Sequence, residues 1–243
     1  MVLHSAFSEG AGVDWCAMTS LRKRACAIAL AGAMLALAGC SHAALPTDTK
    51  ASSSANHPVV VAIGDSIMKG HGLSATQAWP ATLARSTGWN LTNLACDGAG
   101  FATAGDDNDC GADFSGLVNE AVALRPTLII ISGSSNDLGL DNDHLRTETA
   151  SVISSLHAEL PATTIVGIST VWNDSVAPDQ MNDINDQVRA AIHRVKGTYL
   201  DIGQPLAGHR SWLQADRVHP TVRGQQELAE AITGAIRGAK LSI

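Results

Sequence analysis

Two short stretches, far apart in the chain, carry residue types that suit nucleophilic catalysis. Ser66 follows an apolar run in "VVVAIGDSIMKGHG", and His219 follows Asp216 by three residues in "DRVHPT". A serine hydroxyl becomes an effective nucleophile when a base takes its proton and an acid orients that base. The Asp-x-x-His spacing lets the carboxylate fold back onto the imidazole. The sequence therefore predicts Ser66 as nucleophile, His219 as base and Asp216 as the orienting acid.

Acyl transfer also needs donors for the oxyanion that forms on the attacked carbonyl. Three groups are candidates: the backbone N–H of Ser66, Gly98 in "NLACDGAG", and the side-chain amide of Asn136 in "SGSSNDL". Each follows directly after a predicted strand. That common position predicts that the three donors lie together.

Short apolar runs alternate with longer amphipathic segments and must supply the framework for these residues. We expect strands at 59–63, 90–94, 127–132, 164–169 and 198–202. We expect helices at 78–85, 114–124, 144–160, 180–195 and 222–237. Several strands, such as "TLIIIS", are continuously apolar, which is typical of a sheet covered on both faces.

Alternation of strand and helix indicates βαβ units with parallel pairing and right-handed crossovers. The predicted fold class is α/β, a three-layer α/β/α sandwich around a five-stranded parallel sheet. In such sheets, sites collect beyond the carboxyl ends of the strands. This is where the candidate catalytic residues are expected.

The motifs together resemble the GDSL, or SGNH, hydrolase family of flavodoxin-like esterases. "IGDSIMKGHGL" is similar to the family's first block, "NLACDGAG" to the second, "SSNDL" to the third and "DRVHPT" to the last. The resemblance implies a nucleophile at Ser66, oxyanion donors at Gly98 and Asn136, and the acid and base at Asp216 and His219. Four blocks in the expected order, over roughly residues 58–238, are specific evidence.

The sequence departs from the family pattern at two places. Ser134 stands where the third block usually has glycine, so the family pattern does not determine the backbone conformation of the turn around Asn136. Met68 and Lys69 replace small residues after the nucleophile, and we expect them to narrow or charge the pocket mouth. The chain lacks the Gly-x-Ser-x-Gly elbow of α/β-hydrolases, which argues against that fold.

Each candidate also has a simpler interpretation. Ser66 could cap the next helix, Asn136 could form an Asx turn, and His219 could be a helix-entry residue. Asp65 and Asp137 are expected to brace their turns. The joint occurrence of the four blocks favours the catalytic interpretation.

Further residues are left between two roles. His71 could line the pocket or be a solvated loop residue, and the tryptophans could wall a cleft or pack in the core (Trp79, Trp172 and Trp212). The acidic stretch 106–113 resembles a calcium loop, but Cys110 and Leu117 occupy ligand positions, so we interpret it as a solvated loop. We predict no metal and no cofactor.

Composition limits the class of partner. The 243 residues are 45% hydrophobic and carry a formal net charge of −7. An acidic chain without a basic patch is a poor nucleic-acid binder, so we expect no nucleic-acid partner. The expected partners are a small-molecule or glycan ester and, through an N-terminal lipid, a membrane surface.

The amino end has the pattern of an export signal. Three bases precede an uncharged run that ends in "LAGC", so residues 1–40 are predicted to be a signal peptide. "LAGC" resembles the lipobox of bacterial lipoproteins, which implies lipidation of Cys40 and anchoring to the extracytoplasmic side of the cell membrane. An uncleaved anchor or an ordinary secretion signal is the alternative, and Met18 rather than Met1 could be the start. Residues 41–57 are predicted to be a flexible tether, and 58–243 the hydrolase domain.

Two cysteines remain in the predicted mature domain, Cys96 and Cys110. In an exported domain, their separation suggests a disulfide that closes the loop between them, with two buried thiols as the alternative. Loop closure of this length contributes about 3 kcal/mol.

The predicted activity is hydrolysis of small acyl esters through an acyl-enzyme, on envelope or extracellular substrates. An acyltransferase on the same scaffold and a non-catalytic carbohydrate-binding lipoprotein are the alternatives. Acceptor-dependent turnover would indicate the first, and an unreactive Ser66 the second.

Overall fold

The computed structural model of the chain describes residues 57–241. The predicted signal peptide with Cys40, the choice of start codon and the tether up to residue 56 lie outside the described residues. No helix within residues 57–241 is both long enough and apolar enough to cross a membrane.

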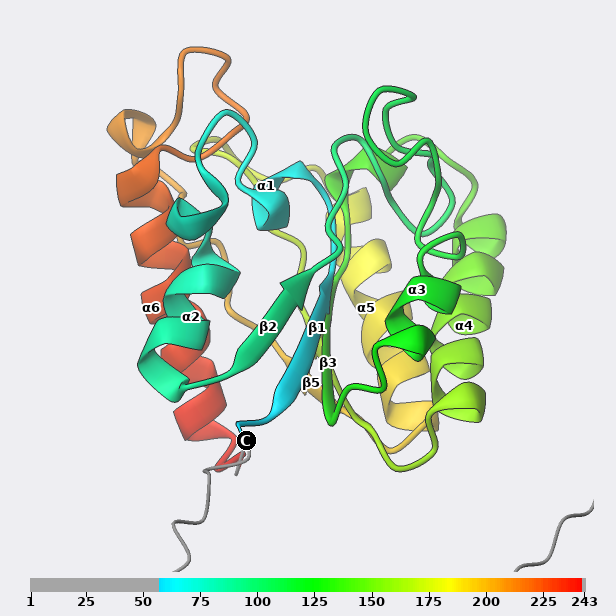
Figure 1. Ribbon diagram of the computed structural model, residues 1–243. Coiled ribbons are helices and arrows are strands. Elements are labelled where there is room, and N and C mark those ends of the chain that lie inside the picture. The colour runs from blue at the N-terminus through cyan, green and yellow to red at the C-terminus, as the bar shows by residue number, and fades with distance from the viewer. Residues whose placement is uncertain (1–56, 242–243) are drawn as a thin grey trace, which may run out of the picture. The chain divides into compact units, whose positions relative to one another are not determined.

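Five parallel strands form one sheet in the order β2-β1-β3-β4-β5 (Figure 1). The strands are β1 (Val59–Ile63), β2 (Asn90–Asn93), β3 (Leu128–Ser132), β4 (Thr164–Ile168) and β5 (Thr198–Leu200). This is the flavodoxin-like order, and it confirms the predicted α/β/α sandwich. The chain runs from β1 outward to β2, then returns past β1 to β3. The end of β1 is therefore the topological switch point of the sheet.

Helices cover both faces of the sheet. They are α1 (Ser66–Lys69), α2 (Trp79–Thr87), α3 (Val118–Ala123), α4 (Asn142–Glu159), α5 (Gln180–Arg194) and α6 (Val222–Gly238). In Figure 1, α2 and α6 lie on one side of the sheet and α3, α4 and α5 on the other. Three short 3-10 turns complete the elements: η1 (Ala75–Gln77), η2 (Ser135–Asp137) and η3 (Arg210–Trp212).

The sheet separates two apolar cores. Alternate residues of a strand point to opposite faces: Val60 and Ala62 of β1 pack toward α2 and α6, whereas Val61 and Ile63 pack toward the other layer. Both sets are fully buried. Two-sided burial explains why β1 and β3 read as continuous apolar runs rather than alternating ones.

The predicted elements differ from the observed ones in two places. The four-residue α1 is too short to show a helical period, so the sequence did not predict it. The helix expected at 114–124 begins only at Val118, because the Asp113 carboxylate accepts the N–H groups of Ser115 and Gly116 and holds that segment in a turn.

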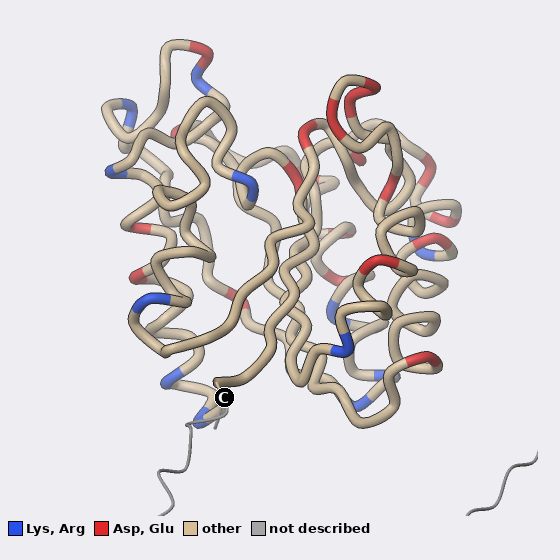
Figure 2. The backbone as a smooth tube through the Cα atoms, in the orientation of Figure 1, with Lys and Arg blue, Asp and Glu red and all other residues tan. Residues whose placement is uncertain are grey.

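Cys96 and Cys110 form a disulfide that closes the long loop after β2, as predicted. Figure 2 shows several acidic segments in the loops near α3 and α4, while Lys and Arg are spread over the trace.

Candidate active site

Ser66 is presented by a sharp change from strand to helix at the end of β1. It is the first residue of α1, and the Asp65 carboxylate caps that helix by accepting the Ile67 N–H at 3.0 Å. Gly70, in the left-handed conformation at φ 83°, ends the helix one turn later. The hydroxyl therefore lies at the amino end of a short capped helix, with its side chain 8% exposed.

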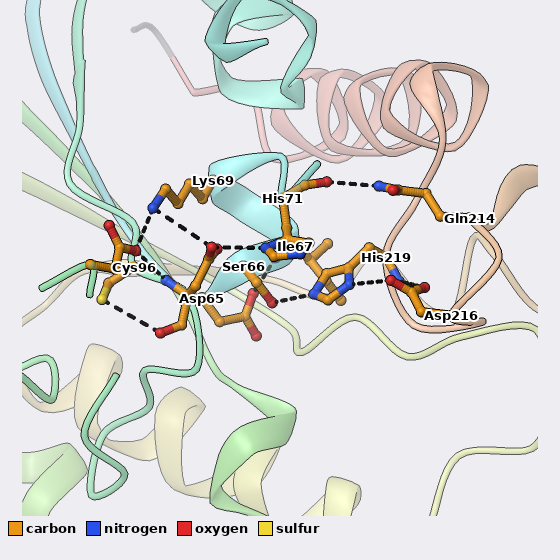
Figure 3. Close-up of polar contacts among 11 residues, drawn as sticks. Asp65, Ser66, Ile67, Lys69, His71, Cys96, Gln214, Asp216 and His219 are labelled. Carbon is orange, nitrogen blue, oxygen red and sulfur yellow. Dashed lines mark hydrogen bonds and ion pairs between the residues drawn. The ribbon is translucent and has the colours of Figure 1, made fainter. Parts of the chain in front are cut away.

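His219 and Asp216 complete a continuous hydrogen-bonded chain with Ser66 (Figure 3). His219 Nε2 lies 2.9 Å from Ser66 Oγ, and its Nδ1 lies 2.8 Å from Asp216 Oδ2. The second carboxylate oxygen of Asp216 accepts the N–H groups of Val218 and His219 at 2.9 and 3.0 Å. The acid thus fixes both the ring and the backbone that carries it.

Asp216 is an ionised carboxylate across the neutral pH range. Desolvation opposes its ionisation, but hydrogen bonds from the Val218 N–H, the His219 ring and the His219 N–H outweigh it and lower the pKa of Asp216 to about 2. An ionised acceptor requires a hydrogen on His219 Nδ1. Nε2 then carries the lone pair and accepts the Ser66 hydroxyl, which is the tautomer a general base needs.

Asp65 lies on the other side of Ser66 in a contrasting environment. Its carboxyl is buried, and burial raises its pKa, although hydrogen bonds from the Ile67 N–H and the Ser134 hydroxyl favour the charged form. Ser134 donates to Asp65 at 3.0 Å and accepts the Asn136 N–H at 3.0 Å. Ser134 therefore links the turn of Ser66 to the turn that carries Asn136.

The three candidate oxyanion donors remain available for a ligand. Asn136 lies in η2, and its Nδ2 uses one hydrogen to bond the Ala99 carbonyl at 2.9 Å. Its second amide hydrogen has no acceptor within residues 57–241, and the same is true of the backbone N–H groups of Ser66 and Gly98. The Ala99 contact brings Asn136 beside Gly98.

The loop that carries Gly98 is fixed to the Asn136 turn by Asp137. Its buried carboxylate accepts the backbone N–H groups of Phe101, Ala102 and Thr103 at 2.7 to 3.1 Å. A Cβ at Gly100 would overlap that carboxylate, so the close approach requires glycine there. Asp65 and Asp137 both brace turns, as the sequence predicted.

The structure corrects the expectation for Met68 and Lys69. Met68 is 1% exposed and packs in the core with α2 and α6, so it does not narrow a pocket mouth. Lys69 forms ion pairs with Asp97 and Asp109 on the loop after β2, and its charge is compensated. The Lys69 ammonium also lowers the pKa of Asp109. The acidic stretch 106–113 is thus only partly a solvated loop.

His71 was left open by the sequence and proves to be part of the site. Its Nδ1 lies 2.8 Å from Asp97 Oδ2, and its ring is stacked on the ring of His219. Sequence reasoning missed the partnership with Asp97, because it joins two loops that are distant in the chain. The one available signal was the position of His71 in the glycine-flanked loop after Ser66.

Of the three tryptophans, one is buried in the core and the other two are partly buried. Trp79 is 2% exposed and belongs to the core, which excludes it from a cleft wall. Trp212 is stacked at 3.6 Å between ring centroids on His209, with the Arg223 guanidinium over its ring. Trp172 is half-buried after β4 and donates to Ser175. Within residues 57–241, no three His, Cys, Asp or Glu side chains are grouped as metal ligands would be.

This geometry suits acyl transfer. A hydroxyl is hydrogen-bonded to an oriented imidazole, and unpaired N–H donors lie nearby at the carboxyl ends of β1, β2 and β3. The sequence-predicted residues Ser66, His219 and Asp216 are in direct contact, while Gly98 and Asn136 are joined to them through Ala99, Ser134 and Asp65.

The model of the GDSL-like lipase/acylhydrolase family matches residues 62–227 of the chain. The match therefore includes every residue of the chain of contacts described above.

Three known proteins illustrate the similarity. A GDSL lipase of Mycobacterium tuberculosis is 28% identical over 194 residues, which cover 74% of this chain and 81% of that protein. A psychrotrophic esterase from Pseudoalteromonas sp. has the same fold with a TM-score of 0.58, at 15% identity, over 74% of this chain and 97% of its own. A salicylyl-acyltransferase from a tetracycline biosynthetic pathway has a TM-score of 0.58 at 21% identity, over 78% of this chain and 56% of its own.

Proposed function

The chain belongs to the GDSL-like lipase/acylhydrolase family, and from this premise we propose that it is a serine esterase that hydrolyses small acyl esters through an acyl-enzyme. One observation carries the proposal: the unbroken contact from Ser66 Oγ through the His219 ring to the Asp216 carboxylate. Non-catalytic packing does not require an imidazole, oriented by a carboxylate, to be aimed at a serine hydroxyl.

In the proposed mechanism, Ser66 Oγ attacks the ester carbonyl carbon while its proton passes to His219 Nε2. Asp216 stabilises the imidazolium that results. The tetrahedral intermediate then expels the alcohol, which leaves with the proton held by His219, and the acyl group remains on Ser66. Water attacks the acyl-enzyme with His219 again as base, and release of the acid restores the Ser66 hydroxyl.

The developing oxyanion is proposed to bind the N–H groups of Ser66 and Gly98 and the Asn136 amide. The Asn136 side chain is already oriented by its bond to the Ala99 carbonyl, so little reorganisation is needed as charge develops. Preorganisation of this kind makes the donors more effective in the transition state than in the ground state.

We infer a small acyl group from the packing behind the nucleophile. Ile67 and Met68, the two residues after Ser66, are buried and occupy that space. The acyl group must then lie in the open part of the site. A small-molecule or glycan acyl ester fits this arrangement.

The first test measures hydrolysis of p-nitrophenyl esters, from acetate to longer chains, by the full chain and by Ser66→Ala. We expect short esters to be turned over fastest, and the variant to lose about 10⁴-fold or more while keeping its thermal midpoint. Ser154→Ala, a serine-to-alanine change on the exposed face of α4, is the matched control. Equal turnover by wild type and Ser66→Ala would exclude Ser66 as nucleophile.

The acyltransferase is the alternative reaction on the same chemistry, because an acyl-enzyme can be attacked by an alcohol instead of water. A structural neighbour that is named as an acyltransferase shares this fold, although that likeness concerns the fold alone. Adding sugars or alcohols to the assay distinguishes the two. Product partition toward an acylated acceptor at millimolar concentration would indicate a transferase.

We also propose export and lipid anchoring through Cys40, on the strength of the "LAGC" motif. Two or more acyl chains would hold the protein on the extracytoplasmic side of the membrane, whereas one chain binds only marginally. Metabolic labelling with a fatty-acid analogue should mark wild type and not Cys40→Ser. Equal labelling of both would contradict the assignment.

A further inference from the structure

A second histidine lies directly against the proposed base. The imidazole of His71, from the loop after α1, is stacked on that of His219 with 4.2 Å between ring centroids and 29° between ring planes (Figure 3). The two rings come from two different loops, and the His219 ring contacts Ser66. The His71 ring therefore limits the directions in which the His219 ring can move.

His71 is itself held from two directions. Its Nδ1 lies 2.8 Å from Asp97 Oδ2, and its backbone carbonyl accepts the Gln214 side-chain amide at 2.7 Å. Gln214 belongs to the same loop as His219, and the same amide also donates to the Pro220 carbonyl at 3.0 Å. The His71 loop and the His219 loop are thus joined by both a hydrogen bond and a ring stack.

Asp97 is in turn fixed by charged groups of the disulfide-closed loop. Its N–H donates to Asp109 Oδ2 at 2.8 Å, and Lys69 Nζ lies 3.7 Å from its carboxylate. Lys69 also pairs with Asp109. His71 therefore has a partner anchored on one side by Cys96 and Cys110 and on the other by the helix that begins at Ser66.

We propose that His71, clamped by Asp97, is a positioning residue for His219: its ring supports the base in the orientation that reaches Ser66. The inference rests on the proposed function, because it assigns His219 the role of general base.

The contacts around the His219 ring define the expected effect. Asp216 holds its Nδ1 edge, Ser66 lies at its Nε2 edge, and the His71 ring covers one of its faces. Without the His71 ring, the His219 ring is free to tilt away from Ser66 Oγ, which slows proton transfer without changing ester binding.

The test compares His71→Phe, which keeps a flat ring without charge, with His71→Ala, which removes both. At pH 8, His71→Phe should keep activity within about threefold, whereas His71→Ala should lose about tenfold in kcat with little change in KM. His144→Phe, an exposed histidine of α4, is the matched control and should shift nothing.

A second readout does not depend on ester turnover. Labelling of Ser66 by a fluorophosphonate probe should be about tenfold slower in His71→Ala and within about threefold of wild type in His71→Phe. Wild-type kcat and labelling rate in His71→Ala, or equal losses in both variants, would overturn the inference while leaving the esterase intact; an active Ser66→Ala would instead overturn the proposed function.

Discussion

Two aspartates flank the Ser66–His219 pair, and the molecule treats them in opposite ways. Asp65 is buried, its pKa is raised, and its bonds run to the Ile67 N–H and the Ser134 hydroxyl. Asp216 lies on an exposed loop, its pKa is lowered to about 2, and its bonds run to His219 and to the backbone beside it. Both carboxyls lie within a few residues of proposed catalytic groups.

The difference shows how the two halves of the site are kept in place. On the nucleophile side, position comes from the core: Asp65 connects the turn of Ser66 to that of Asn136, and Gln225 of α6 bonds the backbone on both sides of the nucleophile loop. On the base side, position comes from local electrostatics around one carboxylate. Substitutions of the supporting residues Asp65 and Gln225 should therefore act on folding, and those of Asp216 on turnover.

The largest effect is expected from Asp216→Asn. The amide can keep the backbone bonds through Oδ1, but its Nδ2 then faces His219 Nδ1 and favours the tautomer with hydrogen on Nε2. That tautomer cannot accept the Ser66 proton, so kcat/KM should fall about 10² to 10⁴-fold. Steady-state kinetics measure the fall in kcat/KM, and thermal unfolding is the control for correct folding. A large fall in the thermal midpoint with little loss of kcat/KM would place Asp216 on the structural side.

The pH profile of the wild type sharpens the same comparison. With its pKa at about 2, Asp216 stays ionised as the pH falls from 8 to 5. The acid limb of kcat/KM should therefore report the imidazoles and not this carboxylate. If Asp216 itself set the limb, Asp216→Asn would abolish the pH dependence of the residual activity instead of preserving it.

Asn136→Ala should have the next largest effect on turnover. Loss of one oxyanion donor lowers kcat by about 10² to 10³-fold. The backbone of η2 should be retained, because its Ser134 cap and the Thr103 bond to the Asn136 carbonyl do not involve the Asn136 side chain. Burst kinetics with p-nitrophenyl acetate separate acylation from deacylation. Wild-type kcat in this variant would remove Asn136 from the oxyanion site.

Gln225→Ala tests the structural side. The fully buried Gln225 accepts the Trp79 N–H and donates to the Ile67 carbonyl, each at 2.8 Å, and its loss leaves two buried backbone groups unpaired. We expect the free energy of unfolding to fall by about 2 to 4 kcal/mol. The matched change on the base side, Gln214→Ala, removes two bonds from a partly exposed loop and should cost less than half as much. Chemical denaturation of both variants measures the free energy of unfolding. Equal losses in the two variants would contradict the proposed difference between the Ser66 side and the His219 side of the site.

The smallest effect concerns the pH dependence of stability in Asp65→Asn. Because the pKa of Asp65 is raised in the folded state, the unfolded chain loses this proton first as pH rises, and stability falls through that window. The asparagine has no such proton and can still accept the Ile67 N–H. Urea midpoints from pH 5 to 8 should therefore decline less steeply with pH in the variant than in wild type. Parallel curves would show that ionisation of Asp65 contributes nothing to the pH dependence of the free energy of unfolding.

Much of this arrangement was predictable from sequence because it is local. An apolar run followed by glycine, acid and serine marks the end of β1, and the observed strand has the predicted limits, Val59–Ile63. The Asp216-x-x-His219 contact is likewise contained in one loop. Strand ends in a parallel sheet meet at one edge, so the relation of Ser66, Gly98 and Asn136 followed from the fold class.

The parts that were not predictable depend on which way a side chain points across the fold. Met68 and Lys69 are adjacent on a single helical turn, yet one is in the core and the other pairs with acids of the β2 loop. The pairing of His71 with Asp97 joins residues 26 positions apart in the chain. No periodicity encodes such contacts, because each depends on how two loops pack.

The disulfide between Cys96 and Cys110 has a practical consequence for handling the protein. The segment that it closes contains Gly98, a proposed oxyanion donor, and Asp97, the partner of His71. Dithiothreitol or a similar thiol in a purification buffer can open this ring and free the segment from its covalent tether. Specific activities from different preparations are therefore comparable only when the thiol content of each sample has been counted. An inactive preparation should be reoxidised and assayed again before it is discarded.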